Sequence, residues 1–495
     1  MKDSLFFSLR TFGQTTQLII AIMCGVLLGI FSLLVTPLWT LAILLGLVSV
    51  IAAIKRPEFA LLAILALLSS VVADTRIPVI NIGTGRIYIT EPIVISLFIV
   101  ILVRWLIEPN FKLAHTPLDL PILLFFGWAI LSTIVALLQS QLQIELMIPE
   151  VRIVSYYLIF FTITNLITKE RNLKLLIEGF FFLATLVSIT VIIQYVFGVT
   201  TLILAGRVEA LWTAGRAYGD VTRITDIVGE GTITVAIITK VVMLFISKPR
   251  FKGWVEFIQW LIIGTAFVMN FNRAHWTAAI GVGLLTVFLV RGIDRQRFIT
   301  WLITFLLLLP LVYIPIIINP DEKTSKFITA SFDRLRSIVT NETLRGSSYV
   351  STITWRNFEY QYAFPQIMNH PLLGLGLGAR YRPMLAEIDH PDFDGRHFIH
   401  NGHVWVMLKT GLVGYFFLMW FCIARIARGF KYWRLIPDSR LRGYFMGFTL
   451  SFLALMFIAT LHTTFMVLYW TPVIALSSGV NEVMIKLYVP NQKPA

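Results

Sequence analysis

Long apolar runs alternate with short polar stretches along the whole of the 495-residue sequence. Each run reaches about 20 residues, enough for a helix to cross the roughly 30 Å hydrocarbon core of a membrane. Because lipid offers no partners for backbone polar groups, such runs predict helices, which satisfy those groups internally. We expect fourteen spans at approximately 17–36, 38–54, 57–73, 91–107, 119–139, 151–167, 172–197, 228–246, 254–271, 275–291, 299–318, 402–424, 443–461 and 464–485.

The lysines and arginines follow the same alternation. If the N-terminus is cytoplasmic, every predicted cytoplasmic segment holds at least two of them. The positive-inside rule therefore favours an even number of spans with both termini in the cytoplasm. The predicted fold class is all-α, a polytopic transmembrane helical bundle with one long, partly helical periplasmic loop. We divide the chain into residues 1–318 with eleven spans, the loop domain 319–401, and residues 402–495 with three spans and a cytoplasmic C-terminus.

Composition agrees with a membrane protein. Hydrophobic residues make up 57% of the chain, charged residues 14%, and the mean hydropathy is +0.80, which excludes an ordinary soluble globular protein. The net charge of +14 does not point to nucleic acid, because many of the positive side chains lie in predicted cytoplasmic segments that face anionic lipid. Cys24 and Cys422 both fall within predicted spans, so no disulfide framework is indicated.

Two outer connections carry local structural signals. In the long loop 319–401, four apolar residues at helical spacing predict an amphipathic helix lying on the membrane face or on the bundle. These residues are Ile328, Phe332, Leu335 and Ile338. A second helix is expected over 350–369, and the glycine-rich run at 374–378 fits either a flexible turn or a cradle of N–H groups for phosphate or sugar. In the connection 74–90, Gly-Thr-Gly between β-branched residues predicts a small hairpin.

Arginines interrupt the apolar sequence at several places on the predicted outer side. They are Arg223, Arg273, Arg356 and Arg380. An arginine near a span costs about 2 kcal/mol or more and normally has an anionic partner. That partner is either a carboxylate of the protein, such as Asp220, Glu230 or Glu359, or an anionic substrate such as a phosphate or diphosphate head group. Both interpretations stay open from the residues alone.

Three histidines at spacing three stand where the long loop meets the next predicted span. His397, His400 and His403 suggest either a metal site completed by Asp392 or Asp394, or a single general base. Imidazole suits proton removal from a hydroxyl near neutral pH.

The residues after His400 predict how it is held. Asn401 is a good N-cap for the following span and would set free helix N–H groups beside the histidine. In a regular helix, eleven residues at about 100° each bring Gly411 to nearly the same face as His400, with Gly414 nearby. Glycines three apart let a neighbouring helix approach closely, which would turn this face toward the protein interior.

These residues resemble the O-antigen ligase and polymerase superfamily of bacterial membrane glycosyltransferases. The signature is His400-Asn401, nine residues, then Gly411-x-x-Gly414. The preceding match comprises Arg356, Tyr360, Ala363, Ile367, His370-Pro371 and Gly374-x-Gly376. Asn272-Arg273-Ala274 stands where the family typically has Ser-Arg-Gly, and His275-Trp276 follows where small residues often sit. The resemblance covers residues 268 to 418, and the remaining spans match only in being helical.

The resemblance implies an enzyme of the inner membrane that takes a glycan from undecaprenyl diphosphate at the periplasmic face. The acceptor would be another glycan or lipid A-core, in polysaccharide or lipopolysaccharide biosynthesis, and ligase and polymerase are both open. By this resemblance His400 activates the acceptor hydroxyl, while Arg273 and Arg356 clamp the diphosphate. Further substrate-binding residues would be Arg380, Arg223, Asn401 and His403. No metal, nucleotide or other cofactor is implied, and direct displacement would invert the anomeric centre.

A transporter of an anionic or lipid-linked substrate is the alternative. Transporters place charged residues or broken helices near the bilayer midplane. Lys409 lies about two turns inside its predicted span and fits either a transport path or the floor of an enzyme site.

Overall fold

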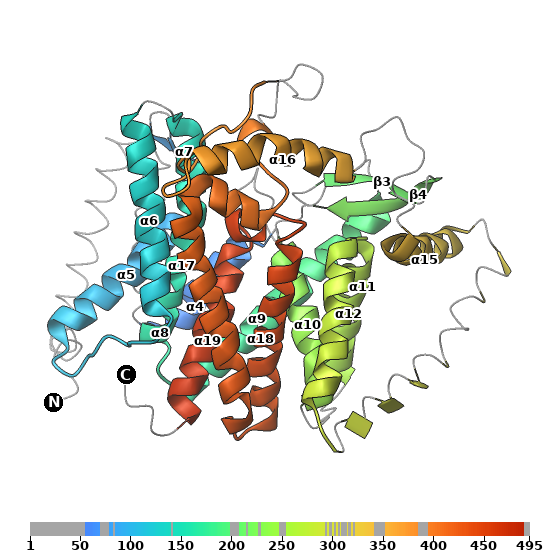
Figure 1. Cartoon of the computed structure of the whole chain (residues 1–495). Coiled ribbons are helices and arrows are strands. Elements are labelled where there is room, and N and C mark those ends of the chain that lie inside the picture. Colours follow the sequence, from blue (N-terminus) through green and yellow to red (C-terminus); the bar gives the residue numbers. More distant parts are fainter. Residues whose placement is uncertain are drawn as a thin grey trace, which may run out of the picture.

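The computed structural model is a helical bundle with two short β-hairpins among the residues that it describes (Figure 1). Those residues are 55–69, 79–82, 85–139, 142–198, 207–213, 216–225, 229–246, 254–292, scattered positions between 295 and 319, 322–340, 352–384 and 395–489. Within them, six helices are long and apolar enough to cross a membrane, which confirms a predominantly helical membrane protein. The count of fourteen spans and their orientation stay predictions. The predicted spans 17–36 and 38–54 lie outside the described residues.

The described helices coincide with predicted spans. The six long ones are α5 (Thr90–Ile107), α6 (Asp119–Leu138), α7 (Ile144–Ser155) continued through η2 (Tyr156–Leu158) into α8 (Ile159–Leu166), α9 (Glu170–Phe197), α17 (Gly402–Tyr432) continued into η6 (Trp433–Leu435), and α18 (Ser439–Ile458). Shorter ones are α4 (Pro57–Leu67), α10 (Glu230–Ile246), α11 (Trp254–Met269), α12 (Arg273–Leu289) and α19 (Thr471–Tyr488).

Helix α18 lies at the centre of the bundle and α5 at its edge. The most apolar stretch of α18 is 78% buried, against 33% for α5. Small residues permit this packing, because a Cβ added at Gly447 of α18 would lie 2.5 Å from the side chain of Thr239 on α10. The outward apolar side chains of α5, such as Ile95 and Leu102, fit contact with lipid.

One end of the bundle carries the non-spanning elements, and we call it the loop end. Helix α16 (Thr352–Asn369) lies across this end, and α15 (Lys323–Thr340) stands beside the hairpin of β3 (Arg207–Thr213) and β4 (Arg216–Thr225) (Figure 1). Both helices of the long loop were predicted, and so was the hairpin of β1 (Val79–Ile82) and β2 (Gly85–Tyr88). The β3–β4 hairpin was not predicted.

Helix α15 buries a different face from the predicted apolar stripe. Ala330, Arg334 and Ser337 are buried against the protein, whereas Leu335 of the stripe is 37% exposed. Phe327 lies on the buried side and contacts the rings of Tyr195 and Phe271 edge-on. The helix therefore packs on the bundle through Phe327 together with small and polar residues.

The segment 371–379 enters the bundle between α6 and α17. Three of its glycines, at 374, 376 and 378, have positive φ values, which side-chain-bearing residues rarely adopt. A Cβ at Gly374 would lie 2.5 Å from the backbone nitrogen of Gly411, and one at Gly378 would lie 2.5 Å from that of Met147. Gly374 and Gly378 are thus required because the backbones of α17 and α7 approach the segment too closely for a side chain.

Helix α17 is broken where this segment meets it. Gly411 has φ +68° and ψ −177°, so the regular helix face predicted to join His400 and Gly411 is wrong. The neighbour of Gly411 is the carbonyl of Leu372 rather than another helix. The carbonyls of Leu408 and Lys409, freed by the break, accept the N–H groups of residues 375 and 376 at 2.9 Å. For Gly414 the predicted helix contact holds, because Trp128 of α6 lies against it.

Candidate functional site

His400 lies at the loop end, two residues before α17 begins, with 41% of its side chain exposed. Its Nδ1 is 2.7 Å from Oε1 of Glu359, and its backbone N–H donates to Oε2 of the same carboxylate at 3.0 Å. Glu359 is on α16 and is 2% exposed. Trp355, one turn earlier, donates its indole N–H to Oε1 at 2.9 Å. The Nε2 atom of His400 has no hydrogen bond among the described residues, so it is the ring nitrogen available to a ligand.

Asn401 also links α16 to α17. Its Oδ1 accepts the backbone N–H groups of residues 403 and 404 at 3.0 and 3.1 Å, which confirms the predicted N-cap of α17. Its amide group donates to the hydroxyl of Tyr360 on α16 at 3.0 Å. By contrast, His403 has both ring nitrogens engaged inside the bundle, 3.1 Å from the Tyr415 hydroxyl and 3.1 Å from the Met456 carbonyl.

Two of the predicted site arginines lie on α12 and on α16, the helix that also carries Glu359. Arg273, the first residue of α12, donates to the hydroxyl of Ser337 on α15 at 3.3 Å. Arg356 of α16 donates to the carbonyl of Leu461 at 2.9 Å, and burial lowers the pKa of Arg356 while Tyr360 and Glu359 oppose that shift. The positive charge of Arg356 acts on Arg273. No ion pair with a carboxylate neutralises either arginine within the described part of the chain.

Arg223 and Arg334 extend this positive region toward the hairpin. Arg223 on β4 pairs with Glu209 at 3.1 Å, and its charge also acts on Arg273. Arg334 of α15 is buried and donates to the carbonyl of Phe271 at 3.1 Å. Burial lowers the pKa of Arg334 to about 8, and the neighbouring charges of Arg223 and Arg273 add to the shift. Sequence reasoning missed Arg334, although it shares a helical period with the small residues of α15 at 330 and 337.

The carboxylates proposed as internal partners of arginines have other partners instead. Glu359 hydrogen-bonds to His400, as described above, and Glu230 contacts His275 at 3.0 Å and Asn272 at 2.9 Å. The side chain of Asp220 lies outside the described residues. Neither described carboxylate forms an ion pair with an arginine, so the anionic-substrate interpretation is the better supported for Arg273 and Arg356, whereas Arg223 has an internal partner in Glu209.

Asn272 and His275, the residues that depart from the family pattern beside Arg273, both lie against Glu230. Asn272 and His275 both contact its carboxylate, and the His275 ring lies 5.5 Å from that of His462. Burial, followed by the charge of His275, lowers the pKa of His462 to about 3. Asn272, His275 and His462 therefore form one buried polar cluster with Glu230. The backbone carbonyls of 461 and 462 connect this cluster to the site, because they accept from Arg356 and from the N–H of Gly402 at the start of α17.

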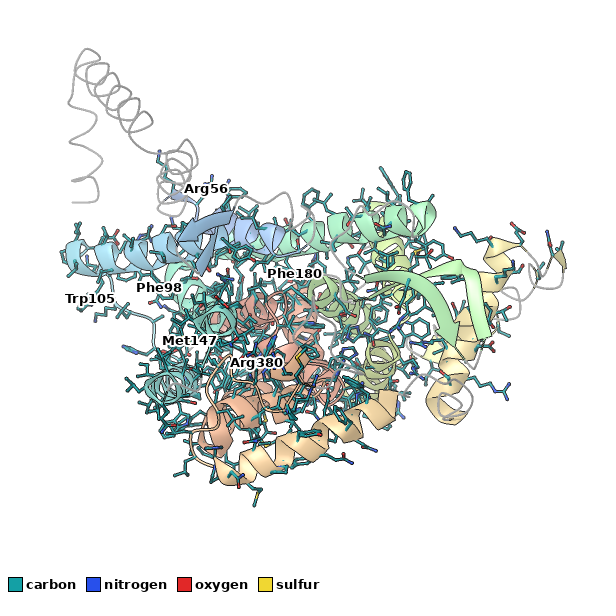
Figure 2. All side chains as sticks on the ribbon, turned by 90° about the horizontal axis from the view of Figure 1, so that it is seen from above. Arg56, Phe98, Trp105, Met147, Phe180 and Arg380 are labelled. Atoms are coloured by element: carbon teal, nitrogen blue, oxygen red, sulfur yellow. The ribbon has the colours of Figure 1, made fainter. Side chains whose placement is uncertain are left out.

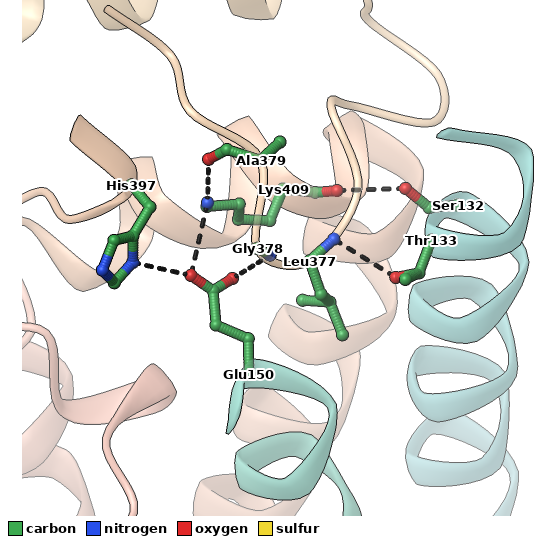
Figure 3. Close-up of polar contacts among 8 residues, drawn as sticks. All are labelled: Ser132, Thr133, Glu150, Leu377, Gly378, Ala379, His397 and Lys409. Carbon is green, nitrogen blue, oxygen red and sulfur yellow. Dashed lines mark hydrogen bonds and ion pairs between the residues drawn. The ribbon is translucent and has the colours of Figure 1, made fainter. Parts of the chain in front are cut away.

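A second buried carboxylate anchors the segment 371–379 (Figure 3). Glu150 of α7 accepts the backbone N–H of Gly378 at 2.7 Å through Oε2. Its Oε1 lies 3.3 Å from Nζ of Lys409 and 3.1 Å from Nδ1 of His397. Lys409 is fully buried and also donates to the carbonyl of Ala379. The charge of Lys409 is thus compensated inside the protein, which favours a place in the floor of a site over a transport path.

The N–H groups of the glycine-rich run are used within the protein. Those of residues 375 and 376 go to α17, that of Leu377 donates to Thr133 at 3.2 Å, and that of Gly378 goes to Glu150. This arrangement supports the turn interpretation over the phosphate cradle. Arg380 follows directly on this anchored segment, over the middle of the bundle in Figure 2.

The three histidines do not converge. His400 contacts Glu359, His397 contacts Glu150, and the ring of His403 lies inside the bundle. Among the described residues no group of three His, Cys, Asp or Glu side chains is placed to hold a metal ion. Asp392 and Asp394, the proposed additional ligands, lie outside the described residues. The geometry favours the single-base interpretation of this cluster.

Residues 258–419 match the family model described as O-antigen ligase. This part of the chain is similar to the O-antigen ligase family. The match runs from α11 to the middle of α17 and includes Arg273, Arg356, Arg380, His400 and Asn401. A search of curated proteins finds no match. The match confirms the resemblance found in the sequence, and the apolar helices among the described residues indicate a multi-pass membrane protein.

Proposed function

We propose that this protein transfers a glycan from undecaprenyl diphosphate to an acceptor sugar at the periplasmic face of a bacterial inner membrane. One observation carries the proposal. His400, with Nε2 available, contacts Glu359 on the helix that also carries Arg356, and the charge of Arg356 acts on Arg273. Within the described residues neither arginine has a carboxylate in an ion pair, and a base together with such arginines suits a reaction in which a hydroxyl loses a proton while a diphosphate leaves.

The proposed reaction is a single displacement. Nε2 of His400 takes the proton of the acceptor hydroxyl as the oxygen bonds to the anomeric carbon of the donor. The bond from that carbon to the diphosphate oxygen breaks, and its electron pair leaves with the lipid diphosphate. Arg273 and Arg356 stabilise the negative charge of the leaving group through charge-assisted hydrogen bonds. Attack from the face opposite the diphosphate inverts the anomeric centre, and the arginines supply positive charge without a metal ion.

The remaining predicted residues take supporting roles in this proposal. Arg223 is assigned to the donor side because its charge acts on Arg273. Arg380 stays a candidate contact to the diphosphate or the sugar. Asn401 holds the helix that follows His400, and His403 is assigned to packing because both of its ring nitrogens have protein partners.

The test uses purified protein in lipid with a short glycan on undecaprenyl diphosphate, without added metal, and follows products by mass. Chains lengthened by whole repeats identify a polymerase, and transfer only after addition of lipid A-core identifies a ligase. Either product supports the proposal, and His400→Ala serves as the inactive control. If neither product forms and the protein instead moves the lipid-linked glycan across proteoliposomes, the transporter alternative replaces it.

A further inference from the structure

We propose that Glu359 is the positioning residue that fixes the tautomer of His400, so that Nε2 is the atom that accepts the proton. This inference rests on the proposed glycan transfer. It assigns a role to a carboxylate that sequence reasoning considered only as a partner for an arginine.

Both oxygens of Glu359 are occupied by donors. The backbone N–H of His400 and the indole N–H of Trp355 can only donate, so Oε2 and Oε1 each act as an acceptor. The same Oε1 lies 2.7 Å from Nδ1 of His400. A nitrogen that meets an accepting carboxylate at this distance is the protonated one of a neutral imidazole. The proton on Nδ1 leaves the lone pair on Nε2, where an acceptor hydroxyl can reach it.

Glu359 holds His400 through two separate contacts, one to the ring and one to the backbone. Glu359 contacts both the ring and the backbone of His400, so the imidazole cannot turn about its own bonds without losing one contact. The next residues repeat the link, because Asn401 donates to Tyr360 at 3.0 Å. Arg356 stands three positions before Glu359 on α16, a spacing that puts both side chains on neighbouring parts of one helix face. One helix therefore orients the base and carries an arginine for the leaving group.

Glu359 also matters once the proton has moved. When Nε2 takes the hydroxyl proton, the ring becomes a cation with protons on both nitrogens. The buried carboxylate faces that cation across the Nδ1 contact and stabilises it. The proton then passes from Nε2 to water after the lipid diphosphate has left.

The decisive variant is Glu359→Gln. With its amide oxygen on the backbone N–H of His400, its NH₂ group faces Nδ1 and favours the tautomer with the proton on Nε2, while the indole N–H of Trp355 loses its acceptor. We expect kcat for glycan transfer to fall about 100-fold or more with the KM for the donor nearly unchanged, as wrong-tautomer variants of histidine bases do. Glu359→Asp keeps the charge and should recover part of the rate.

Nitrogen-15 NMR of histidine-labelled protein provides a readout that a purely structural role would not move. The ring signals of His400, assigned by their loss in His400→Ala, should show Nε2 unprotonated in the wild type and protonated in Glu359→Gln. Glu482→Gln is the matched control, because Glu482 is also buried but pairs with Arg428 at 2.6 Å. It should leave the His400 signals unchanged.

The outcomes separate this inference from the proposed function. Wild-type rate in Glu359→Gln, or loss of rate with the His400 tautomer unchanged, overturns the positioning role and leaves glycan transfer standing. A wild-type protein that transfers no glycan overturns the proposed function, and the NMR signals then still decide whether Glu359 fixes the tautomer.

Discussion

Two histidines that are three residues apart each pair with a different glutamate, and the pairs differ in what else each carboxylate contacts. His400 meets Glu359 at 2.7 Å, and His397 meets Glu150 at 3.1 Å. Both carboxylates are buried and both accept a backbone N–H. The third partner differs, because Glu150 has the ammonium group of Lys409 at 3.3 Å whereas Glu359 has a neutral indole.

The difference in the third partner separates the two roles. A carboxylate compensated by a lysine has little charge left to stabilise an imidazolium, so the Glu150 pair holds a backbone segment in place. Glu359 has no such lysine and can support proton transfer at His400. Exposure agrees with this division, since the His400 side chain is 41% exposed and that of His397 is 23% exposed.

The largest effect is expected from removing each histidine in turn. His400→Ala should lower glycan transfer by about 1,000-fold or more, because it removes the base, while His397→Ala should keep activity within about 10-fold. Product formation by mass measures both variants at equal membrane insertion. Equal losses in the two variants would remove the distinction between the pairs, and full activity in His400→Ala would end the general-base role.

Breaking the Glu150 pair should act on stability. Lys409→Met leaves a buried carboxylate without its lysine and should lower the free energy of unfolding by about 3–5 kcal/mol. The double variant Lys409→Met with Glu150→Gln removes both charges and should recover part of that loss. Thermal unfolding in detergent compares them, and an unchanged midpoint in Lys409→Met would show that this ion pair does not hold the segment 371–379.

The arginines near His400 should be sensitive to shape as well as charge. Arg273→Lys keeps the charge but loses the forked guanidinium, so it should be nearly as harmful as Arg273→Ala, at about 100-fold in kcat/KM. Arg440→Lys, at an exposed pair with Glu256, is the matched control and should be silent. Full activity of Arg273→Lys would mean that a point charge is enough.

A smaller effect is expected at the indole that supports Glu359. Trp355→Phe removes one of the three hydrogen bonds to the Glu359 carboxylate and keeps an aromatic side chain. Glycan transfer should therefore fall about 3-fold to 10-fold. Steady-state kinetics with saturating donor measures the change. A loss as large as that of His400→Ala would indicate that Trp355 does more than orient the carboxylate.

No effect is expected from a chelator. Since the histidines of the two pairs face different carboxylates, transfer should proceed unchanged after treatment with a strong chelator of zinc. An activity that is lost and then restored by added zinc would mean that His397 and His400 share a metal ion.

The helices were predictable because their signals are local. Runs of about 20 apolar residues predicted α6 and α9, helical spacing predicted α15, and the cap at Asn401 followed from one residue type before a span. The match of residues 258–419 agrees with motifs that were visible in the sequence.

The contacts that define the site were not local. His397 and Glu150 are 247 positions apart and His400 and Glu359 are 41 apart, so no periodic pattern connects them. The break at Gly411 was missed because one glycine in an apolar run does not predict a positive φ, and here the reason is a neighbouring backbone. The β3–β4 hairpin was missed because its arginines were considered only for their chemistry.

The broken helix α17 has a consequence for biogenesis. Its carbonyls at 408 and 409 are satisfied by N–H groups of residues 375 and 376, which the ribosome makes earlier. Helix α17 is therefore synthesised after the segment that supplies its hydrogen-bond donors. Without the earlier segment these two buried carbonyls would have no hydrogen-bond partners, so both parts are needed to complete the fold.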